Sequence, residues 1–409
     1  MSFKDIITYF KQSNFLQKLV ESFFGRISYM IFSLLFSLIC TRIYGVELFG
    51  VYTHAFTIVT ILMIVARAGL DNGMMYSIPR NKYLHVSFSF VVNFILAVGL
   101  TIIGGFIYND PYIWFVLPLI WLVSSEQLFF ALYRTEGKIK EFYFINGFMA
   151  ILLRVVFVIL CYFLIGQNEY SIAIAVYLSF LFSNLIYILH QKGKFQKIHF
   201  DMGHLKYSFP LLFATLMATI INKVDILMLG SMATKQDVGV YQITFQISST
   251  ISIFLFVFNT VFAPKIADLY HNNKLEELRR IYVNSTRALA ALAALYFATI
   301  VIFDDFILWV FGEEVVAGKT ALLMRNVAQL INVAVGSVWL MLSMTGKPKF
   351  QMYANFCAVI MNIALNFVLI PEYGINGAAF ASMVAILFTN IAGYIVVSTR
   401  FKVKVYKYI

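Results

Sequence analysis

Five basic residues stand inside long apolar segments of this 409-residue chain: Arg26, Arg67, Arg154, Lys223 and Arg325. Each costs about 2.5–3.5 kcal/mol at the centre of an apolar helix in a bilayer, so such residues usually face a cavity or an opposite charge. Arginine also binds phosphate oxygens bidentately and stays protonated, which suits it to a phosphate or pyrophosphate group. We therefore predict that these five residues line a cationic substrate-binding cavity.

Acidic residues lie at a similar depth: Glu21, Asp71, Glu126 and Asp225. Pairing is the alternative to a cavity, because Arg67 and Asp71 are four residues apart on one helix face. Lys223 and Asp225 are two apart and face differently, and Arg325 is near enough to a span end to reach the interface instead. Asp71, Glu126 and Asp225 are predicted to be charge partners or sites for a coupling ion.

Uncharged polar residues accompany these charges, chiefly in the second half of the chain. The amides among them are Gln242, Gln246, Gln329, Asn332, Asn355, Asn362 and Asn366. Hydrogen bonds between helices explain some of them. We expect a first half lined with cations, which hold a phosphate or pyrophosphate, and a second half lined mainly with amides, which suit sugar hydroxyls.

The composition shows which solvent surrounds these residues. Apolar residues make up 61% of the chain and charged residues 12%, with a mean hydropathy of +0.82. A soluble protein is roughly 45–50% apolar and 25% charged, and it cannot hide this much apolar surface. The net charge of +11 is spread between apolar blocks, so membrane topology explains it better than nucleic-acid binding.

A bilayer core of about 30 Å needs about 20 residues per helix, which predicts an all-α integral membrane protein with about twelve transmembrane helices. The spans fall near 19–40, 52–78, 84–107, 112–133, 142–165, 170–190, 205–230, 238–263, 286–311, 320–344, 350–370 and 375–398. Segments on the side of the N-terminus carry 23 Lys and Arg, and the opposite loops carry three. The positive-inside rule then puts both termini in the cytoplasm, across a cytoplasmic (inner) membrane. Residues Phe3–Phe10 have the apolar spacing of a helix lying on the inner surface.

Three short motifs recur in the same order in both halves. Gly50-Val51-Tyr52 returns as Gly239-Val240-Tyr241, Gly137-Lys138 as Gly346-Lys347, and Leu181-Phe182-Ser183-Asn184 as Leu387-Phe388-Thr389-Asn390. Six helices separate the copies, which predicts two parallel six-helix repeats with a binding site near the midplane between them. We expect an N-terminal lobe at 1–191, a cytoplasmic linker at 192–206 and a C-terminal lobe at 207–409.

The sequence gives no sign of an enzyme, a cofactor or a metal site. The three cysteines are scattered, the six histidines have no ligand spacing, and no complete Walker A motif is present. Outer loops are too short for a membrane-embedded polymerase or glycosyltransferase. Without ATP, energy must come from an ion or substrate gradient or from the membrane potential, which is worth about 2.3 kcal/mol per charge per 100 mV.

Several segments resemble a known family. They are Arg42-Ile43-Tyr44-Gly45, Phe49-Gly50-Val51-Tyr52, Ala68-Gly69-Leu70-Asp71, Lys223-x-Asp225-Ile226-Leu227-Met228-Leu229-Gly230, Pro264-Lys265-Ile266-Ala267 and Asn366-Phe367-Val368-Leu369-Ile370-Pro371 with Tyr373-Gly374-Ile375-Asn376-Gly377. In this order they are similar to signatures of the polysaccharide (O-antigen type) flippases. Those proteins belong to the multidrug/oligosaccharidyl-lipid/polysaccharide exporter superfamily, which also contains the MATE transporters.

The resemblance implies two six-helix lobes around a cationic cavity, and alternating access. It implies that a polyprenyl-pyrophosphate-linked oligosaccharide is turned from the inner to the outer leaflet for capsule, O-antigen or exopolysaccharide synthesis. Expected partners are this substrate, membrane lipids, a coupling cation (Na+ or H+), and a polysaccharide polymerase with its assembly proteins. The alternative is an ion-coupled multidrug antiporter of the same superfamily, which calls for a membrane-embedded acid and a more apolar cavity.

Overall fold

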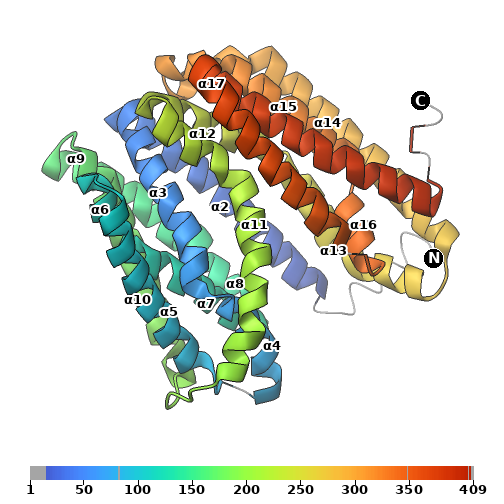
Figure 1. The fold of residues 1–409 in the computed structure, drawn as a ribbon, viewed down its shortest axis with the longest axis horizontal. Coiled ribbons are helices and arrows are strands. Elements are labelled where there is room, and N and C mark those ends of the chain that lie inside the picture. The colour runs from blue at the N-terminus through green and yellow to red at the C-terminus, as the bar shows by residue number, and fades with distance from the viewer. Residues whose placement is uncertain (1–14, 82, 348, 404, 407–409) are drawn as a thin grey trace. The chain divides into compact units, whose positions relative to one another are not determined.

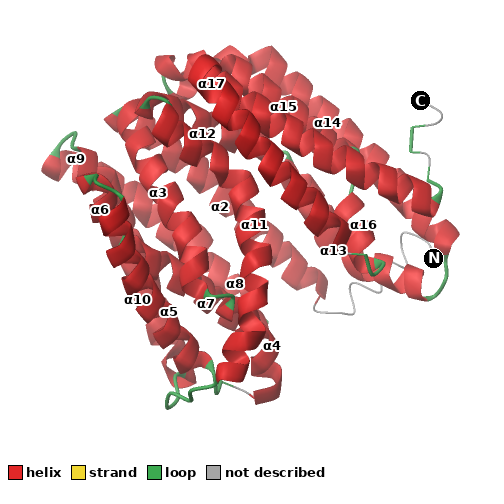
Figure 2. Cartoon of the chain, in the orientation of Figure 1, coloured by secondary structure: helices red, strands yellow, loops and turns green. Residues whose placement is uncertain are grey.

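The computed structural model describes residues 15–406 except 82, 348 and 404, and all regular structure within that part is helical (Figure 2). The side chains of residues 15–23, 26, 80, 81, 210, 214, 218, 261 and 264 also lie outside the description. The surface helix predicted at Phe3–Phe10 therefore falls outside the described residues.

The helices follow the expected apolar segments in order (Figure 1). The first half contains α2 (Phe15–Tyr44), α3 (Val46–Arg67), α4 (Leu70–Asn81), α5 (Val86–Ile107), α6 (Pro111–Val116), α7 (Leu119–Thr135), α8 (Ile139–Tyr143), the π-helix η1 (Phe144–Ala150), α9 (Ile151–Ile165) and α10 (Glu169–Gln191). The second half contains the 3-10 helix η2 (Lys192–Lys194), α11 (Met202–Met232), α12 (Lys235–Ser249), α13 (Ser252–His271), α14 (Leu275–Phe311), the 3-10 helix η3 (Glu313–Gly318), α15 (Lys319–Ala334), α16 (Val338–Met344) and α17 (Lys349–Phe401).

Within the described residues, nine helices are long and apolar enough to cross a membrane, and two bent pairs raise this number to eleven. The last helix, α17, has 53 residues, which is too long for one crossing of a core about 30 Å thick. Its backbone breaks at Gly374, where φ is +52°. Counting α17 as two crossings gives twelve, and the chain is a multi-pass membrane protein.

One expected span is broken where the sequence predicts a continuous helix over 52–78. Ala68 and Gly69 both have positive φ, of +50° and +72°, and they separate α3 from α4. Gly69 also lies against the carbonyl oxygen of Ser208, which a Cβ atom would approach to 2.1 Å. Only glycine fits this combination of conformation and contact, so the break is fixed by packing.

The repeated Gly-Lys motif forms the same turn in both halves. Gly137 and Gly346 have φ of +72° and +78°. In each case the following lysine N–H donates to the carbonyl five residues earlier, from Lys138 to Tyr133 and from Lys347 to Leu342, at 2.8 Å in both. This is a Schellman motif with glycine at its left-handed position. The repeated Gly-Lys motif therefore marks the same kind of helix end in both halves.

Two compact units divide the described chain. Unit 1 contains α2 up to Tyr44 and Tyr52–Thr219, and unit 2 contains Gly45–Val51 and the residues from Ile220 onward. Residues 192–206, predicted to be a linker, lie in the range of unit 1. Lys194 in this segment and Lys138 pair with Glu136 at 2.8 and 3.1 Å. Partial burial acts to raise the pKa of Glu136, but hydrogen bonds from Lys194, Tyr83 and Lys138 outweigh it and lower this pKa to about 2.

The two copies of the Gly-Val-Tyr motif meet inside unit 2, where the start of α3 crosses α12. A Cβ atom on Gly50 would lie 1.7 Å from the carbonyl oxygen of Lys235, and one on Gly239 would lie 2.3 Å from the carbonyl oxygen of Val46. Both glycines thus allow direct backbone contact between the helices, as small residues do in membrane proteins.

The substitution Gly50→Ala should destabilise this crossing, because its methyl group has no room beside Lys235. We expect a loss of about 1–3 kcal/mol, the usual cost of overpacking, seen as a lower melting temperature of the purified protein. Gly99→Ala is the matched control, since nothing lies within 4 Å of its Cβ position. Equal melting temperatures for Gly50→Ala and the wild type would refute the tight crossing.

Candidate functional site

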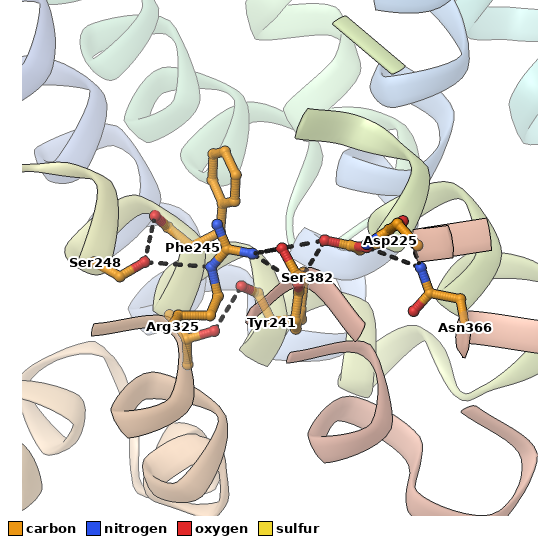
Figure 3. A network of polar contacts seen from close by, with 9 residues as sticks. Asp225, Tyr241, Phe245, Ser248, Arg325, Asn366 and Ser382 are labelled. Carbon is orange, nitrogen blue, oxygen red and sulfur yellow. Dashed lines mark hydrogen bonds and ion pairs between the residues drawn. The ribbon is translucent and has the colours of Figure 1, made fainter. Parts of the chain in front are cut away.

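A buried ion pair occupies the interior of unit 2. Asp225 on α11 and Arg325 on α15 are 1% and 2% exposed, and Arg325 Nη1 lies 3.6 Å from Asp225 Oδ2 (Figure 3). The interfacial position left open for Arg325 is therefore excluded. Because the two residues are 100 positions apart, the partner of Arg325 comes from the tertiary fold.

Neutral side chains complete the network around this pair (Figure 3). The Tyr241 hydroxyl donates to Asp225 Oδ2 at 2.8 Å, and Asn362 and Asn366 both donate to Oδ1, at 3.0 and 2.9 Å. Arg325 donates to the hydroxyl oxygens of Tyr241, Ser382 and Ser248, at 2.9, 2.7 and 3.3 Å. Two amides expected to meet sugar hydroxyls are thus hydrogen-bonded to Asp225.

Lys223, the other basic residue of unit 2, lies against an aromatic ring. Its Nζ is 5.4 Å from the centre of the Phe245 ring, and the Arg325 guanidinium lies over the same ring at 4.6 Å. Cation–π contacts hold a positive charge without neutralising it. Among the described residues, no carboxylate oxygen lies within 4.0 Å of Lys223.

In unit 1, Arg67 is paired. Its Nη1 lies 2.9 Å from Asp71 Oδ2, with side chains 7% and 15% exposed. The pair spans the break at Ala68 and Gly69, so it also ties the end of α3 to the start of α4. Arg67 thus resembles Arg325: its charge is matched inside its own unit.

Arg154 on α9 has neutral neighbours. Its guanidinium lies 4.6 Å from the centre of the Phe180 ring and 5.8 Å from that of Phe36, and its Nε is 3.4 Å from Ser179 Oγ. In the part of unit 1 that the structure describes, no carboxylate oxygen lies within 4.0 Å of this head group. Arg154 and Lys223 are therefore two cations held against phenylalanine, one in each unit.

Glu126 on α7 is also buried, at 4% exposure. Asn146 Nδ2 donates to its Oε1 at 2.6 Å, and Ser183 Oγ donates to its Oε2 at 3.2 Å. The remaining predicted site residue is Arg26, whose side chain lies outside the described part. The structure thus groups the predicted residues into two ion pairs, two cations on aromatic rings and one carboxylate with neutral donors.

Several residues of these clusters were not predicted from the sequence. Tyr241, Ser248 and Ser382 accept hydrogen bonds from Arg325. The rings of Phe180 and Phe245 make cation–π contacts with Arg154 and Lys223. The sequence could have indicated Tyr241, because this residue belongs to the repeated Gly-Val-Tyr motif. Serines and phenylalanines are too common in apolar helices to stand out. Within the described residues, no three His, Cys, Asp or Glu side chains are grouped to hold a metal ion.

Removing one member of the Asp225–Arg325 pair should be costly. Arg325→Met leaves a buried carboxylate without its cation, and we expect the free energy of unfolding to fall by about 3–5 kcal/mol. The double variant Asp225→Asn/Arg325→Met should lose less than Arg325→Met alone. Glu276→Gln, which removes an exposed pair with Arg279, should change stability by about 0–1 kcal/mol. Thermal unfolding in detergent compares all three, and a double variant that loses as much stability as Arg325→Met, or more, would contradict the coupling of Asp225 and Arg325.

Two known proteins with similar sequences are named as flippases. The chain is 24% identical over 162 residues to a Haloferax volcanii protein named "Probable low-salt glycan biosynthesis flippase Agl15", covering 39% of this chain and 34% of that protein. It is 25% identical over 170 residues to the "Probable flippase AglR" of the same organism, covering 41% and 36%. The chain thus matches about a third of the length of these two relatives. An uncharacterized membrane protein of Methanocaldococcus jannaschii, MJ1375, is 22% identical over 384 residues, covering 86% and 90%.

Solved structures with the same fold include a MATE family transporter and a further MOP superfamily transporter. An inward-facing multidrug resistance MATE family transporter of the MOP superfamily superposes with a TM-score of 0.78 at 15% identity, covering 91% of this chain and 94% of that one. A Pyrococcus furiosus MOP superfamily transporter, described as having a binding pocket of reverse polarity, gives 0.67 at 12% identity, covering 95% of each. The expected all-α membrane fold of the MATE type is confirmed.

Two family models match the chain. The MatE model covers residues 210–368. The model described as polysaccharide biosynthesis protein covers residues 15–270, which is more than half of the chain and includes most of unit 1 with α11 and α12. The chain belongs to the polysaccharide biosynthesis protein family of membrane transporters.

Proposed function

We propose that this protein is a flippase that moves a polyprenyl-pyrophosphate-linked oligosaccharide repeat unit from the inner to the outer leaflet by alternating access. The transported unit would serve the synthesis of a surface polysaccharide. Support comes from membership of the polysaccharide biosynthesis protein family, from the relatives named as flippases, and from the transporter fold.

The observation that carries this proposal is which intramembrane cations pair with a carboxylate and which do not. Arg67 and Arg325 are neutralised by Asp71 and Asp225, so their role is structural. Arg154 and Lys223 have only neutral and aromatic neighbours within contact distance in the described part. A partly buried cation within a membrane span that contacts no carboxylate is costly unless it has a ligand, and the ligand that matches it is an anion. We therefore assign phosphate binding to Arg154 and Lys223.

The proposed transporter has two lobes and uses the membrane potential. We propose lobes at 1–191 and 207–409 joined by the linker 192–206, with both termini in the cytoplasm of the producing cell. A negative cell interior favours outward movement of an anionic headgroup by about 2.3 kcal/mol per charge per 100 mV. A coupling cation and a polysaccharide polymerase are the further partners of this model, and no chemical step is assigned to the chain.

An ion-coupled multidrug antiporter is the second candidate, favoured by the match to the MatE model and by the MATE structures. A cationic drug needs a carboxylate that is free to bind it. Asp71 and Asp225 are paired with arginines, and Glu126 accepts hydrogen bonds on both oxygens. This distribution of charge favours an anionic substrate.

Replacing either proposed phosphate ligand should slow flipping. A hydrogen bond to a charged group is worth about 1.5–3 kcal/mol, so Arg154→Gln or Lys223→Gln should weaken headgroup binding roughly 10- to 100-fold. The measurement is mass spectrometry of lipid extracts from a host that lacks the gene and carries each variant at matched protein level. The wild type should prevent accumulation of the complete lipid-linked repeat unit, and both variants should allow it.

Lys140→Gln is the matched control, because Lys140 is an exposed cation on α8. It should behave as the wild type does. If the gene's loss leaves the lipid-linked pool unchanged and instead alters resistance to cationic drugs, the antiporter is the correct function.

A further inference from the structure

Glu126 differs from the other two candidate coupling acids because no cation lies beside it. Asp71 and Asp225 each have an arginine within 4.0 Å, whereas among the described residues no Lys or Arg nitrogen lies that close to Glu126. Its partners are the Asn146 amide and the Ser183 hydroxyl. A buried carboxylate without a cation can be neutralised by a proton, so Glu126 has the surroundings of a proton-binding group.

The hydrogen bonds around Glu126 fit both of its charge states. Ser183 Oγ lies 3.2 Å from Glu126 Oε2 and 3.1 Å from the carbonyl oxygen of Phe180. When Glu126 is ionised, the Ser183 hydroxyl donates to it. When Glu126 is protonated, its new O–H donates to Ser183 Oγ, and Ser183 donates to Phe180 instead. Asn146 donates to Oε1 in both states, so no polar group is left unpaired.

The elements α10 and η1 connect Glu126 with Arg154. On α10, Ser183 faces Glu126, while Ser179 and Phe180 contact the Arg154 guanidinium. The π-helix η1 supplies Asn146 to Glu126, and its last residue, Ala150, accepts a hydrogen bond from Ser179 at 2.7 Å. π-Helical turns occur frequently at functional sites. Arg154 is also the cation that interacts electrostatically with Glu126.

Among the described residues, no other ionisable group near α7 takes the place of Arg154 as the cation that interacts with Glu126. The elements packed against α7 are α4, α5, α8 and α10. Arg67 at the end of α3 and Asp71 on α4 are paired. Of the other ionisable residues of α4, Tyr76 is exposed, and the side chain of Arg80 lies outside the described part. Helix α5 has no ionisable side chain, and Lys140 and Glu141 of α8 are exposed. On α10, the Tyr187 phenol interacts with Glu126, and His190 is hydrogen-bonded to Tyr133. The other ionisable groups of α10 are Glu169 and Tyr170 at the opposite end of the helix and Tyr177, which donates to the carbonyl oxygen of Phe115.

We propose that Glu126 binds a proton whose uptake is linked to binding of the anionic headgroup at Arg154. The proposal rests on the proposed function, since it needs a phosphate at Arg154. With Arg154 unoccupied, its charge stabilises the Glu126 carboxylate. When a phosphate takes up the charge of Arg154, that stabilisation weakens and the carboxylate takes a proton from water. Binding free energies are reciprocal, so a proton on Glu126 strengthens phosphate binding in turn.

The test measures binding of farnesyl diphosphate, a short prenyl diphosphate, to the full-length protein in nanodiscs over a range of pH. Glu126→Gln keeps an oxygen for Asn146 and a donor for Ser183 but has no charge. Affinity should rise more steeply with falling pH in the wild type than in Glu126→Gln, by up to about tenfold per pH unit for one linked proton. Protonation of the ligand itself affects both proteins equally, so it cancels in the comparison. At the alkaline end, Glu126→Gln should bind more tightly than the wild type.

Two further variants define the outcome. Glu141→Gln, an exposed carboxylate on α8, should keep the wild-type pH dependence. Arg154→Gln should weaken binding and lose the part of the pH dependence that Glu126 adds. Equal pH dependence in the wild type and Glu126→Gln, with binding retained, would overturn this inference and leave the proposed function standing. Absence of binding by the wild type at every pH would overturn both.

Discussion

The cost of a charge in an apolar interior is the constraint on which this structure depends. In a bilayer, water does not solvate a buried head group, so each one needs an opposite charge, a set of hydrogen bonds, an aromatic ring or a ligand. The described residues use the first three, and we propose the fourth, a ligand, for Arg154 and Lys223. Arg67 and Arg325 use carboxylates, Glu126 uses an amide and a hydroxyl, and Arg154 and Lys223 use phenylalanine rings.

These solutions separate residues that hold the fold from residues available to a substrate. The Asp225–Arg325 pair joins α11 to α15, and Asn362 and Asn366 tie α17 to the same carboxylate. A network with this many partners fixes the helices of unit 2 and leaves little affinity for anything else. Arg154 and Lys223 have no carboxylate oxygen within 4.0 Å among the described residues, which leaves them available to a phosphate ligand. In the proposed function, these two cations bind the phosphate groups of a lipid-linked sugar.

Much of the fold could be predicted from the sequence because hydrophobic length and the spacing of charges act locally. The twelve spans and the Arg67–Asp71 pairing both depend on residues close together in the chain. The repeated Gly-Lys motif marked a helix end that does recur. The site was harder to predict. Arg325 finds Asp225 only through packing of α11 against distant helices, and Asn366, expected to meet sugar, instead bonds that carboxylate. The break within 52–78 depends on contact with Ser208, which no local pattern reveals.

In the proposed function, the protein carries an anionic lipid headgroup across the bilayer on the cations that do not pair with a carboxylate of the chain. The most direct measurement is transbilayer movement in proteoliposomes of a fluorescent prenyl-pyrophosphate-linked sugar, with a fluorescent cationic dye assayed in parallel. We expect the wild type to move the anionic lipid and not the dye, and the Arg154→Gln/Lys223→Gln double variant to move neither. Movement of the dye without movement of the lipid would contradict it.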